Sequence, residues 1–179
     1  MASSAPASTL EVRRVHGVGD GELEALADVL IDCVEGGASV SFMLPMTRAK
    51  ALAFWRQVAD GVARGERALL VAEDGQGIVG TVQVILAQPE NQPHRADVAK
   101  MLVHRRSRRQ GAGAALMRAA EGAALDEGKT LLVLDTADAT AARLYARLGW
   151  QAAGTIPRYA LLPAGGECAT TYFYRSLAT

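Results

Sequence analysis

The sequence has few residues of the types that build disulfide frameworks or metal centres. Only two cysteines and three histidines occur in 179 residues. The cysteines, Cys33 and Cys168, are far apart and have no metal-ligand spacing, so we expect no disulfide framework and interpret Cys33 as a core thiol. The histidines at positions 16, 94 and 104 are equally scattered, and we expect no metal site.

The sequence also lacks an excess of either charge and a long apolar run. Nineteen basic and nineteen acidic residues give a formal net charge of zero, which argues against nucleic acid or an anionic membrane as the main partner. No apolar run reaches membrane-spanning length, and residues 1–9 are small and polar, without a hydrophobic signal region. We therefore expect a flexible tail over residues 1–9, a single domain over residues 10–179, and a cytoplasmic protein.

Apolar periodicity in the rest of the chain predicts an α/β fold. Alternating or continuous apolar runs favour strands, and an apolar spacing of three to four residues favours helices. Asp20 and Thr47 are the expected N-caps of the first two helices, and Phe54 and Trp55 in the second are interpreted as core residues. Strands are expected at 10–15, 68–72, 78–86, 96–103, 130–135, 151–156 and 170–175, with helices at 20–36, 47–62, 113–128 and 141–148.

The most informative segment is Lys100–Met117, in which an apolar strand leads through a basic turn into an alanine-rich helix. The first N–H groups of a helix have no partner within it, and the helix dipole adds partial positive charge there. Gly111 and Gly113 would let an anion approach the backbone, and Arg108 and Arg109 would add full charges. This pattern indicates a pyrophosphate site, with a solvated loop and a nucleic-acid patch as alternatives for the basic run.

The spacing within this segment narrows the choice of nucleotide site. No Gly-Lys-Ser/Thr follows the turn, which excludes a P-loop, and the third glycine of a dinucleotide fingerprint is missing. Arg108-x-x-Gly111-x-Gly113 instead resembles the Arg/Gln-x-x-Gly-x-Gly/Ala signature of the GCN5-related N-acetyltransferases (GNAT). A second block, Asp138–Trp150, resembles the family's Asn-x-x-Ala-x-x-Leu-Tyr-x-x-x-Gly-Phe helix, with Asp in place of Asn and Trp in place of Phe.

The resemblance implies the GNAT fold, a central mixed, splayed β-sheet flanked by about four helices. It also implies acetyl-CoA as the acetyl donor and no metal, with the pantetheine arm in a gap between the strands around Met101 and Leu132. Exposed amide edges in a splayed sheet need partners, and pantetheine carries two amides. The implied cofactor contacts are Met101, Leu102, Val103, Arg108, Arg109, Gln110, Gly111, Ala112, Gly113, Ala114, Asp138 and Arg143.

Acetyl transfer to an amine needs an acid for the leaving thiolate and stabilisation of the carbonyl oxygen. Tyr145 is expected on the buried face of its helix, and the resemblance implies that its hydroxyl reaches the cofactor sulfur and acts as the acid. An aromatic packing residue with a satisfied hydroxyl is the alternative. Backbone N–H groups near Met101–Val103 are the candidates for stabilising the oxygen, aimed by a strand bulge that the resemblance implies.

A base for the acceptor amine is expected among two carboxylates that lie in largely apolar strands, Asp97 and Asp135. For Asp97 the alternative is a salt bridge to Arg95 or Lys100. For Asp135 the alternative is a capping or turn role before the second motif block. Both carboxylates are therefore candidate catalytic residues.

The acceptor site is expected around the segment Gly36–Met43, between the first two helices. The resemblance implies that this segment covers the acceptor, and a plain helix C-cap is the alternative. Asp97 and Asp135 could hold the ammonium group of the acceptor, and Arg158 or another arginine could pair with a carboxylate. The expected acceptor contacts are Gly37, Ser39, His94, Arg158 and Tyr159.

Three short runs look similar to the tabtoxin-resistance acetyltransferases of this family: Gly36–Val40, Arg95–Lys100 and Leu134–Thr136. They favour a small amino-acid-like acceptor such as a toxin or antibiotic. A protein lysine or N-terminal amine is the second hypothesis, and a non-catalytic acyl-CoA-binding sensor is the third. Tyr145 and the two candidate bases argue against the sensor. The sequence leaves open whether the protein is a monomer or a homodimer.

Overall fold

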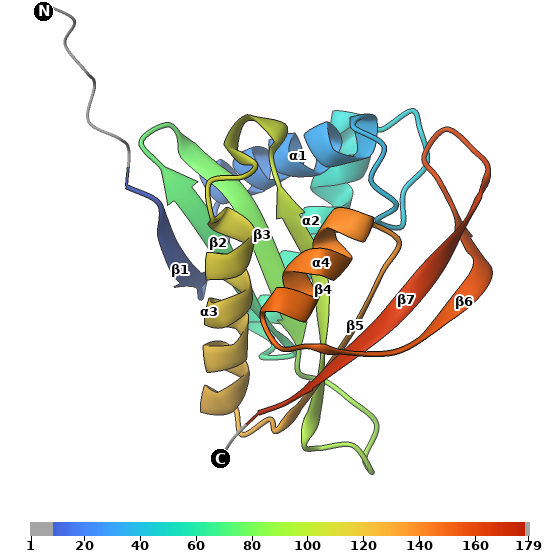
Figure 1. Ribbon diagram of the computed structural model, residues 1–179. Coiled ribbons are helices and arrows are strands. Elements are labelled where there is room, and N and C mark those ends of the chain that lie inside the picture. Colours follow the sequence, from blue (N-terminus) through green and yellow to red (C-terminus); the bar gives the residue numbers. More distant parts are fainter. Residues whose placement is uncertain (1–8, 178–179) are drawn as a thin grey trace, which may run out of the picture.

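The structure is a computed structural model that describes residues 9–177 (Figure 1). Its strands form one seven-stranded sheet in the order β1-β2-β3-β4-β5-β7-β6. The strands are β1 (Glu11–Val15), β2 (Arg67–Asp74), β3 (Gly77–Ile85), β4 (Arg95–Val103), β5 (Leu131–Thr136), β6 (Gln151–Leu161) and β7 (Glu167–Ser176). The helices are α1 (Asp20–Glu35), α2 (Arg48–Ala63), α3 (Ala112–Asp126) and α4 (Ala139–Arg147), with a short 3-10 helix η1 (Arg105–Ser107). Residues 1–8 of the expected tail lie outside the described residues.

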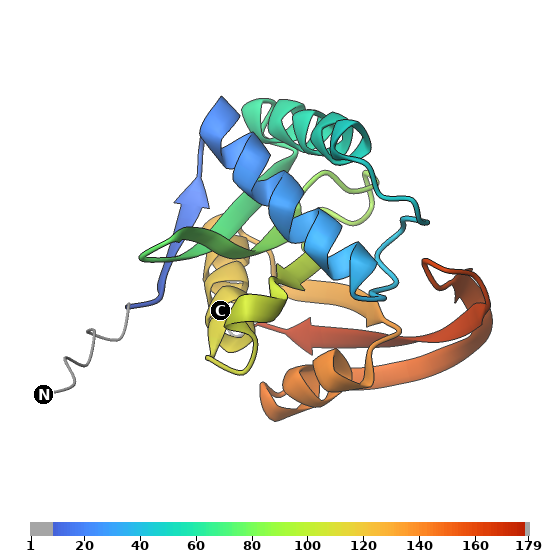
Figure 2. The ribbon, with the colours of Figure 1, turned by 90° about the horizontal axis from the view of Figure 1, so that it is seen from above.

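The predicted fold class and element order are confirmed. The sheet is mixed, because β4 and β5 run parallel while all other neighbouring strands run antiparallel. Helices α1 and α2 cover one face of the sheet, and α3 and α4 cover the other (Figure 2). Within residues 9–177, no helix has both the length and the apolar character needed to cross a bilayer.

Each face of the sheet has its own hydrophobic core. Leu26 and Cys33 of α1 and Trp55 of α2 are buried against one face, which confirms the predicted core roles of the thiol and the indole. On the opposite face, Leu116 of α3 packs with Leu132 of β5. Full burial of one such side chain contributes about 1.5–3 kcal/mol. The two cores fix the helix layers on either side of the sheet.

The parallel strands β4 and β5 pair over only three residues each. Arg95–Asp97 pairs with Leu131–Val133, after which β4 continues to Val103 and β5 to Thr136 without pairing to each other. The outer neighbours remain in place, β3 beside β4 and β7 beside β5. The sheet is therefore splayed, as predicted, and the facing edges have no partner strand. We call the facing segments 98–103 and 134–136 the β4–β5 split.

A bulge in β4 changes the face that its side chains occupy. Two residues, Lys100 and Met101, stand opposite the single residue Val82 of β3. Before the bulge, Val98 packs in the core beneath α3, and after it, Leu102 packs in the core beneath α1 and α2. Lys100 has a positive φ of 51°, which is rare for a residue with a side chain. The bulge that the family resemblance implies is present.

The ends of several elements differ from the sequence prediction. Gly19, rather than Asp20, is the N-cap of α1, and its N–H donates to Glu22 Oε2 at 3.0 Å. Strands β6 and β7 are also longer than the predicted 151–156 and 170–175. The reason is that β6 is solvent-exposed along nearly all of its length, so no apolar alternation marks its extent.

Asp32 of α1 ties the end of β4 to the helix layer. Its carboxylate accepts hydrogen bonds from the Arg105 backbone N–H at 2.8 Å and from Arg105 Nε at 2.9 Å, and His104 Nδ1 lies 3.6 Å away. Burial acts to raise the pKa of Asp32, but the Arg105 hydrogen bonds and the nearby positive charges outweigh it and lower the pKa. This contact fixes η1, which joins β4 to the turn before α3.

We predict that Asp32→Asn lowers the free energy of unfolding by about 1–3 kcal/mol at pH 7, because the amide loses charge-assisted hydrogen bonds. Since the folded-state pKa of Asp32 is lowered, its stabilisation is present above the unfolded pKa of about 3.9 and is lost as the pH falls through the folded value. Urea unfolding between pH 7 and pH 3 should show a difference that shrinks in acid.

The control is Asp28→Asn on the same helix, which breaks an exposed ion pair with Arg48. Its expected cost is at most about 1 kcal/mol. The quantity to compare is the free energy of unfolding of the wild type minus that of Asp32→Asn. If this difference stays constant down to pH 3, or if it is no larger than the difference for the control, the assigned role of the carboxylate is wrong.

Candidate active site

The turn before α3 presents unpaired backbone N–H groups to open space. Gly111 is the N-cap residue of α3, with a positive φ of 85°, and no side chain caps the helix. Within the described part of the chain, the backbone N–H groups of residues 111–114 have no backbone acceptor. A Cβ built on Gly111 would meet no atom within 4 Å. This geometry suits an anion, which is the role predicted for the turn.

Gly113 has a different reason to be glycine from the one predicted. A Cβ at this position would lie 3.0 Å from Leu144 Cδ2 of α4 and 3.8 Å from the Met101 side chain of β4. A side chain here would therefore push α3 away from its neighbours. Gly113 lets α3, α4 and β4 approach one another, in addition to leaving its N–H among the free groups of the turn.

The basic run after β4 divides into two functional classes. Arg105 binds Asp32, and Arg106 binds Asp74 at 2.6 Å, so these two arginines hold the fold. Arg108 Nε donates only to the Val103 backbone oxygen at 3.3 Å, and Arg109 is exposed with a φ of 62°. The guanidinium groups of Arg108 and Arg109 form no salt bridge with any residue among 9–177. They are therefore the charges available beside the turn.

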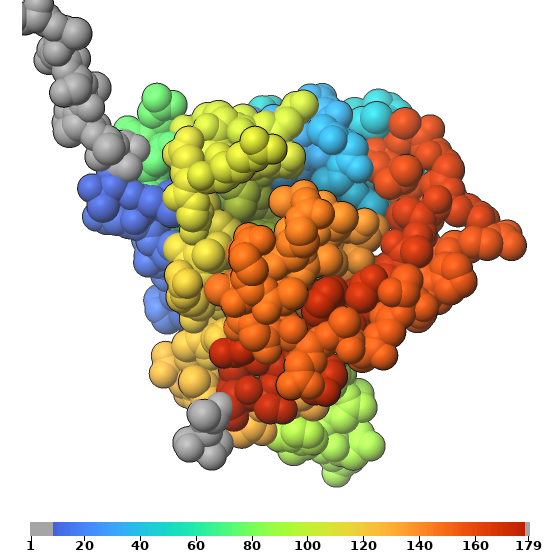
Figure 3. All heavy atoms as spheres, in the orientation of Figure 1, coloured from blue at the N-terminus to red at the C-terminus, as the bar shows by residue number. Residues whose placement is uncertain are grey.

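The β4–β5 split lies next to this turn. In the space-filling view, the surface is recessed between the turn before α3 and helix α4, and atoms of β4 lie deeper than either (Figure 3). Met101 and Val103 pack toward the α3–α4 core, while Leu102 is buried on the opposite face. The predicted contacts from Met101 to Ala114 therefore form one continuous stretch, from the strand end through the turn to the start of α3.

Tyr145 of α4 has a buried ring and a hydroxyl without a strong partner. The residue is 4% exposed, and its ring packs against Trp150 and Phe173, with centroids 6.1 and 5.8 Å away. Burial, followed by the negative charges of Asp138 and Asp135, raises the pKa of the hydroxyl. The hydroxyl therefore keeps its proton at neutral pH. Packing and proton donation are compatible in this position, because the ring and the hydroxyl have different surroundings.

The other two predicted contacts from this motif lie in the N-terminal half of α4, at its N-cap and in its second turn. Asp138 is the N-cap residue, and its Oδ1 accepts from the Thr140 N–H at 2.7 Å. Arg143 is exposed, and its Nη2 donates to Thr140 Oγ1 at 3.2 Å. Asp138 thus performs the capping function that was an alternative for Asp135.

Asp135 lies on β5 at the split and is exposed. Its Oδ2 accepts from Thr170 Oγ1 of β7 at 2.7 Å, and Tyr172 is its neighbour across the β5–β7 pair. The carboxylate forms no salt bridge with another of the residues 9–177. Oδ1 consequently remains available to receive a proton.

Asp97 lies on β4 at the last residue pair before the split, and it is already engaged. It forms an ion pair with Arg95, and its Oδ2 accepts from Gln88 Nε2 at 3.0 Å. Gln88 Oε1 in turn accepts from Arg95 Nη2 at 2.6 Å. Asp97, Arg95 and Gln88 thus bind one another, which is the salt bridge to Arg95 that was the alternative for Asp97. These contacts make Asp97 less available than Asp135 as a base.

The segment 36–47 between α1 and α2 links β4 to the β6–β7 hairpin. Ser39 Oγ donates to the Leu161 oxygen at 3.3 Å, and the Leu44 N–H donates to the Pro163 oxygen at 3.0 Å. Figure 2 shows the segment beside the tip of the hairpin. Gly37, at a φ of 92°, lets the chain leave α1 in this direction. The segment therefore does more than end a helix.

Lys100, Ser41 and Phe54 form a cluster on the α1–α2 face of the split that sequence reasoning missed. Lys100 Nζ donates to Ser41 Oγ at 2.9 Å and lies 5.9 Å from the centre of the Phe54 ring. Phe54 is only partly buried, unlike its neighbour Trp55. The sequence carried one signal for this cluster, a lysine within an otherwise apolar strand.

Tyr159 lies on β6 on the same side of the molecule as Asp135. Its hydroxyl is 2.8 Å from the Tyr172 hydroxyl, and the two rings meet edge to face. The hydrogen bond with Tyr159, with further contributions from burial and from Asp135, raises the pKa of Tyr172 to about 12. The predicted contact Tyr159 therefore reaches the site through Tyr172.

Of the predicted acceptor contacts, His94 is not brought to the segment 36–43, and Arg158 already has a partner. His94 precedes β4 at its paired end, where its backbone oxygen accepts from the Thr130 and Leu131 N–H groups at 2.8 and 3.2 Å. Lys100, which contacts the segment, lies six strand residues further on, roughly 20 Å away. Arg158 is 78% exposed at the hairpin and donates to Glu167 from Nε at 2.6 Å and from Nη2 at 3.1 Å. The Glu167 carboxylate thus binds the guanidinium that was predicted to bind a carboxylate of the acceptor.

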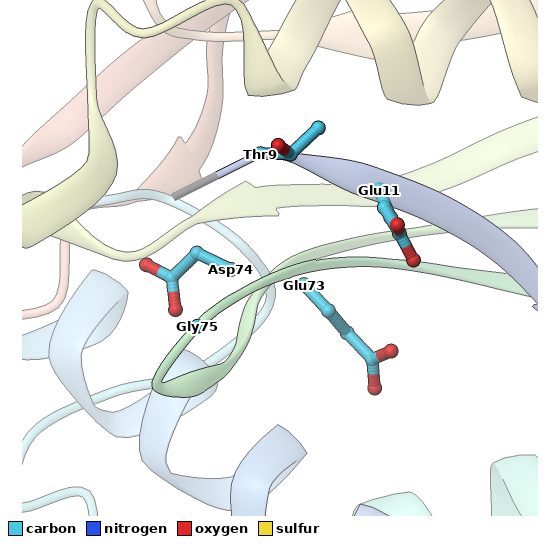
Figure 4. A pocket seen from close by; sticks show the side chains of 5 residues that line it. All are labelled: Thr9, Glu11, Glu73, Asp74 and Gly75. Atoms are coloured by element: carbon cyan, nitrogen blue, oxygen red, sulfur yellow. The ribbon is translucent and has the colours of Figure 1, made fainter. Parts of the chain in front are cut away.

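Two pockets of about 280 Å³ lie away from the split. Figure 4 shows the side chains that line the first pocket. Of these, Glu73 forms an ion pair with Arg13, and Asp74 forms one with Arg106. That pocket is lined by Thr9, Glu11, Glu73, Asp74 and Gly75. The second is lined by Ala25, Asp28, Gln76, Gly77, Ile78, His104 and Arg106. Neither contains Tyr145 or Asp135. No group of three metal-ligating side chains occurs among the residues that the structure describes.

Comparison with known proteins agrees with this geometry. Residues 65–152 match the family model of the acetyltransferase (GNAT) domain. The matched range contains β4, the turn before α3, β5 and α4, and so both sequence motifs.

Solved structures share the fold over nearly the whole chain. A ribosomal-protein-alanine N-acetyltransferase from Brucella melitensis has a TM-score of 0.77 at 20% identity, covering 93% of this chain and 99% of its own. A proposed phosphinothricin N-acetyltransferase has a TM-score of 0.77 at 18% identity, covering 96% and 100%. A proposed acetyltransferase from Salmonella typhimurium, solved with its cofactor acetyl-CoA, has a TM-score of 0.74 at 16% identity, covering 94% of each chain. The chain thus has the GNAT fold, and its residues 65–152, just under half of the sequence, match the acetyltransferase (GNAT) domain.

Proposed function

We propose that this enzyme transfers the acetyl group to the amine of a small, amino-acid-like acceptor by direct attack of the amine. The observation that carries the proposal is the segment 36–47, which is tied to β4 through Ser41 and to the β6–β7 hairpin through Ser39 and Leu44. A covered acceptor side favours a small molecule, whereas an open groove favours a peptide. The proposal includes an acceptor of the tabtoxin-resistance type.

The donor side fits acetyl-CoA. The free N–H groups of residues 111–114, with Arg108 and Arg109, suit a pyrophosphate. The unpaired edges of the β4–β5 split suit an arm that carries amide groups. When bound, acetyl-CoA supplies a thioester-activated acetyl group. The N–H groups at the bulge, from Met101 to Val103, are the candidates for stabilising negative charge on the acetyl oxygen, and one such donor contributes about 10²–10³ in rate.

Two side chains provide the proton transfers. Asp135 is the base in this proposal, because it lies at the split without a cationic partner, whereas Asp97 is engaged by Arg95 and Gln88. Tyr145 is the acid for the leaving thiolate, because its hydroxyl stays protonated and the motif helix brings it to the split. The two groups come from adjacent elements, β5 and α4.

Two other functions compete with this proposal. The names of two structural neighbours point to different acceptors, phosphinothricin in one and ribosomal-protein alanine in the other, so these names do not decide between a small molecule and a protein. A non-catalytic acyl-CoA sensor would need neither a free carboxylate nor a protonated phenol at the split.

The proposal predicts the outcome of an acceptor screen. Thiol release from acetyl-CoA should be measured with free amino acids, amino-acid toxins with a strained ring, simple amines and lysine-containing peptides. Free amino acids or their analogues should be turned over. Turnover of peptides alone would reject the small-molecule acceptor, and binding of acetyl-CoA without turnover of any amine would support the sensor.

A matched glycine pair tests the donor site. Gly111→Val should raise the Kd for acetyl-CoA at least about tenfold, because the side chain fills the space above the free N–H groups. Gly128→Val is the control, since Gly128 follows the same helix, has a φ of 72° and also faces open space. Both substitutions force a side chain into the left-handed region at about 1–2 kcal/mol.

Calorimetry and urea unfolding separate the two effects. Both glycine variants should lose similar stability, and only Gly111→Val should lose affinity for acetyl-CoA. Equal affinity in the two variants would remove the turn from the donor site.

The proton transfers should differ in their response to pH. Asp135→Asn and Tyr145→Phe should each lower kcat by about 10²–10⁴ at neutral pH. The loss in Asp135→Asn should shrink as the pH rises, because the acceptor amine then loses its proton without help. The loss in Tyr145→Phe should persist from pH 6 to pH 9.

Matched controls are a second aspartate and a second tyrosine, on β4 and β7. Asp97→Asn should retain most of the rate, since Asp97 is engaged by Arg95 and Gln88. Tyr174→Phe should also retain it, because the Tyr174 hydroxyl donates to Gln151 at the start of β6. Wild-type turnover in Tyr145→Phe would show that the phenol only packs, and a pH-independent loss in Asp135→Asn would remove its role as base.

A further inference from the structure

Lys100 occupies the α1–α2 face of the split only because of the β4 bulge. In a regular strand alternate residues face the same side, so Lys100 would point with Val98 toward the core beneath α3. The extra residue at Lys100–Met101 reverses this, and the ammonium group instead meets Ser41 and Phe54. A φ of 51° is a strained backbone conformation for a residue with a side chain. The strand keeps a strained conformation that brings a cation to the acceptor side.

The surroundings of Lys100 leave its charge incompletely compensated. Its Nζ donates to one neutral hydroxyl, Ser41 Oγ, and lies near the Phe54 ring. No carboxylate oxygen of residues 9–177 lies within the 4.0 Å of a salt bridge, although Asp135 is close enough to favour the charged form. Burial lowers the pKa of Lys100 despite that attraction. Two of the three N–H groups of the ammonium therefore lack a strong partner, and an anion would supply one.

The distribution of the other cations points to the same residue. Arg158 is paired with Glu167, and Arg95 is paired with Asp97. Lys50 also lies 5.9 Å from an aromatic ring, that of Phe42, but it is exposed and donates to the Met43 backbone oxygen. Arg108 and Arg109 also lack a salt bridge, but they belong to the turn before α3. Among residues 9–177, Lys100 is thus the cation on the two strands of the split that has no carboxylate partner.

We propose that Lys100 is a specificity-determining residue that binds the carboxylate of the acceptor, while Asp135 on the neighbouring strand receives its amine. Lys100 and Asp135 lie on β4 and β5 and attract each other without forming a direct ion pair. An α-amino acid carries a cationic and an anionic group on one carbon, so it can satisfy both residues at once. This inference rests on the proposed small amino-acid-like acceptor and names the part of the acceptor that is recognised.

The test compares each amino acid with its carboxamide, which keeps the amine and removes the negative charge. The probes are the free L-amino acids turned over by the wild type and the corresponding L-amino-acid amides. Lys100→Met should raise KM for the amino acids about 10- to 100-fold and leave kcat within about threefold, because a charge-assisted hydrogen bond is lost on binding. KM for the amides should not change, and Lys100→Arg should recover part of the preference.

Two further variants separate recognition from a structural role. Ser41→Ala removes the hydrogen bond to Lys100 but keeps the charge, so it should preserve the preference for amino acids over amides. Lys50→Met removes another lysine that lies beside a phenylalanine ring, but outside the split. It should change neither the KM for amino acids nor the KM for amides. An equal rise in KM for amino acids and amides in Lys100→Met would show a structural role only and overturn the inference.

Failure of the inference and failure of the proposed function give different results. If the wild type turns over amino acids and amides equally well, Lys100 does not recognise a carboxylate, although the small acceptor is retained. If the wild type turns over only lysine-containing peptides, the small acceptor is wrong and the inference falls with it.

Discussion

β4 and β5 separate after three paired residues, and the positions of the candidate functional groups follow from that separation. Had the two parallel strands stayed paired to their ends, each would have satisfied the amide edge of the other. Instead, β5 continues beside β7 and β4 beside β3. The unpaired edges are costly in isolation, so the split is a place where a ligand with amide groups gains hydrogen bonds that the protein does not make itself.

One bulge serves both sides of the split. Met101 packs toward α3 and α4, where Gly113 allows close approach, and Lys100 points toward α1 and α2. The residues proposed for the donor side and for the acceptor side therefore lie on the two faces of a single strand. The hydrogen bonds from Arg105 to Asp32 attach the next segment of the chain to α1. They therefore fix the position of η1 between the end of β4 and the turn at Gly111.

Local sequence patterns were sufficient for the fold and for the turn and helix that hold the proposed donor site. The apolar periodicity, the glycines of the turn and the helix containing Tyr145 are short-range signals, and each corresponds to a local conformation. The buried Trp55 followed from helical spacing in the same way. Predictions of this kind depend on residues within a few positions of one another, and the structure agrees with most of them.

The acceptor side could not be predicted with the same detail. Ser41 and Lys100 are 59 residues apart, and no local pattern indicates that they touch. The bulge has no glycine to mark it, so the side on which Lys100 lies was hidden. Arg158 was predicted to pair with a carboxylate of the acceptor. Its pairing with Glu167 was missed because the strands expected at 151–156 and 170–175 include neither residue. Long-range contacts and strand register decide these positions.

Residue-resolved amide hydrogen exchange, measured by NMR with and without acetyl-CoA, tests the central role of the split most directly. The account predicts that acetyl-CoA slows exchange at residues 111–114 and at those amides of 98–103 that do not pair with β3. It also predicts that acetyl-CoA leaves the exchange rates of Glu73–Gly75 nearly unchanged. These residues line the pocket at the far edge of the sheet. Protection confined to that pocket, with unchanged exchange at the turn and the split, would contradict the account.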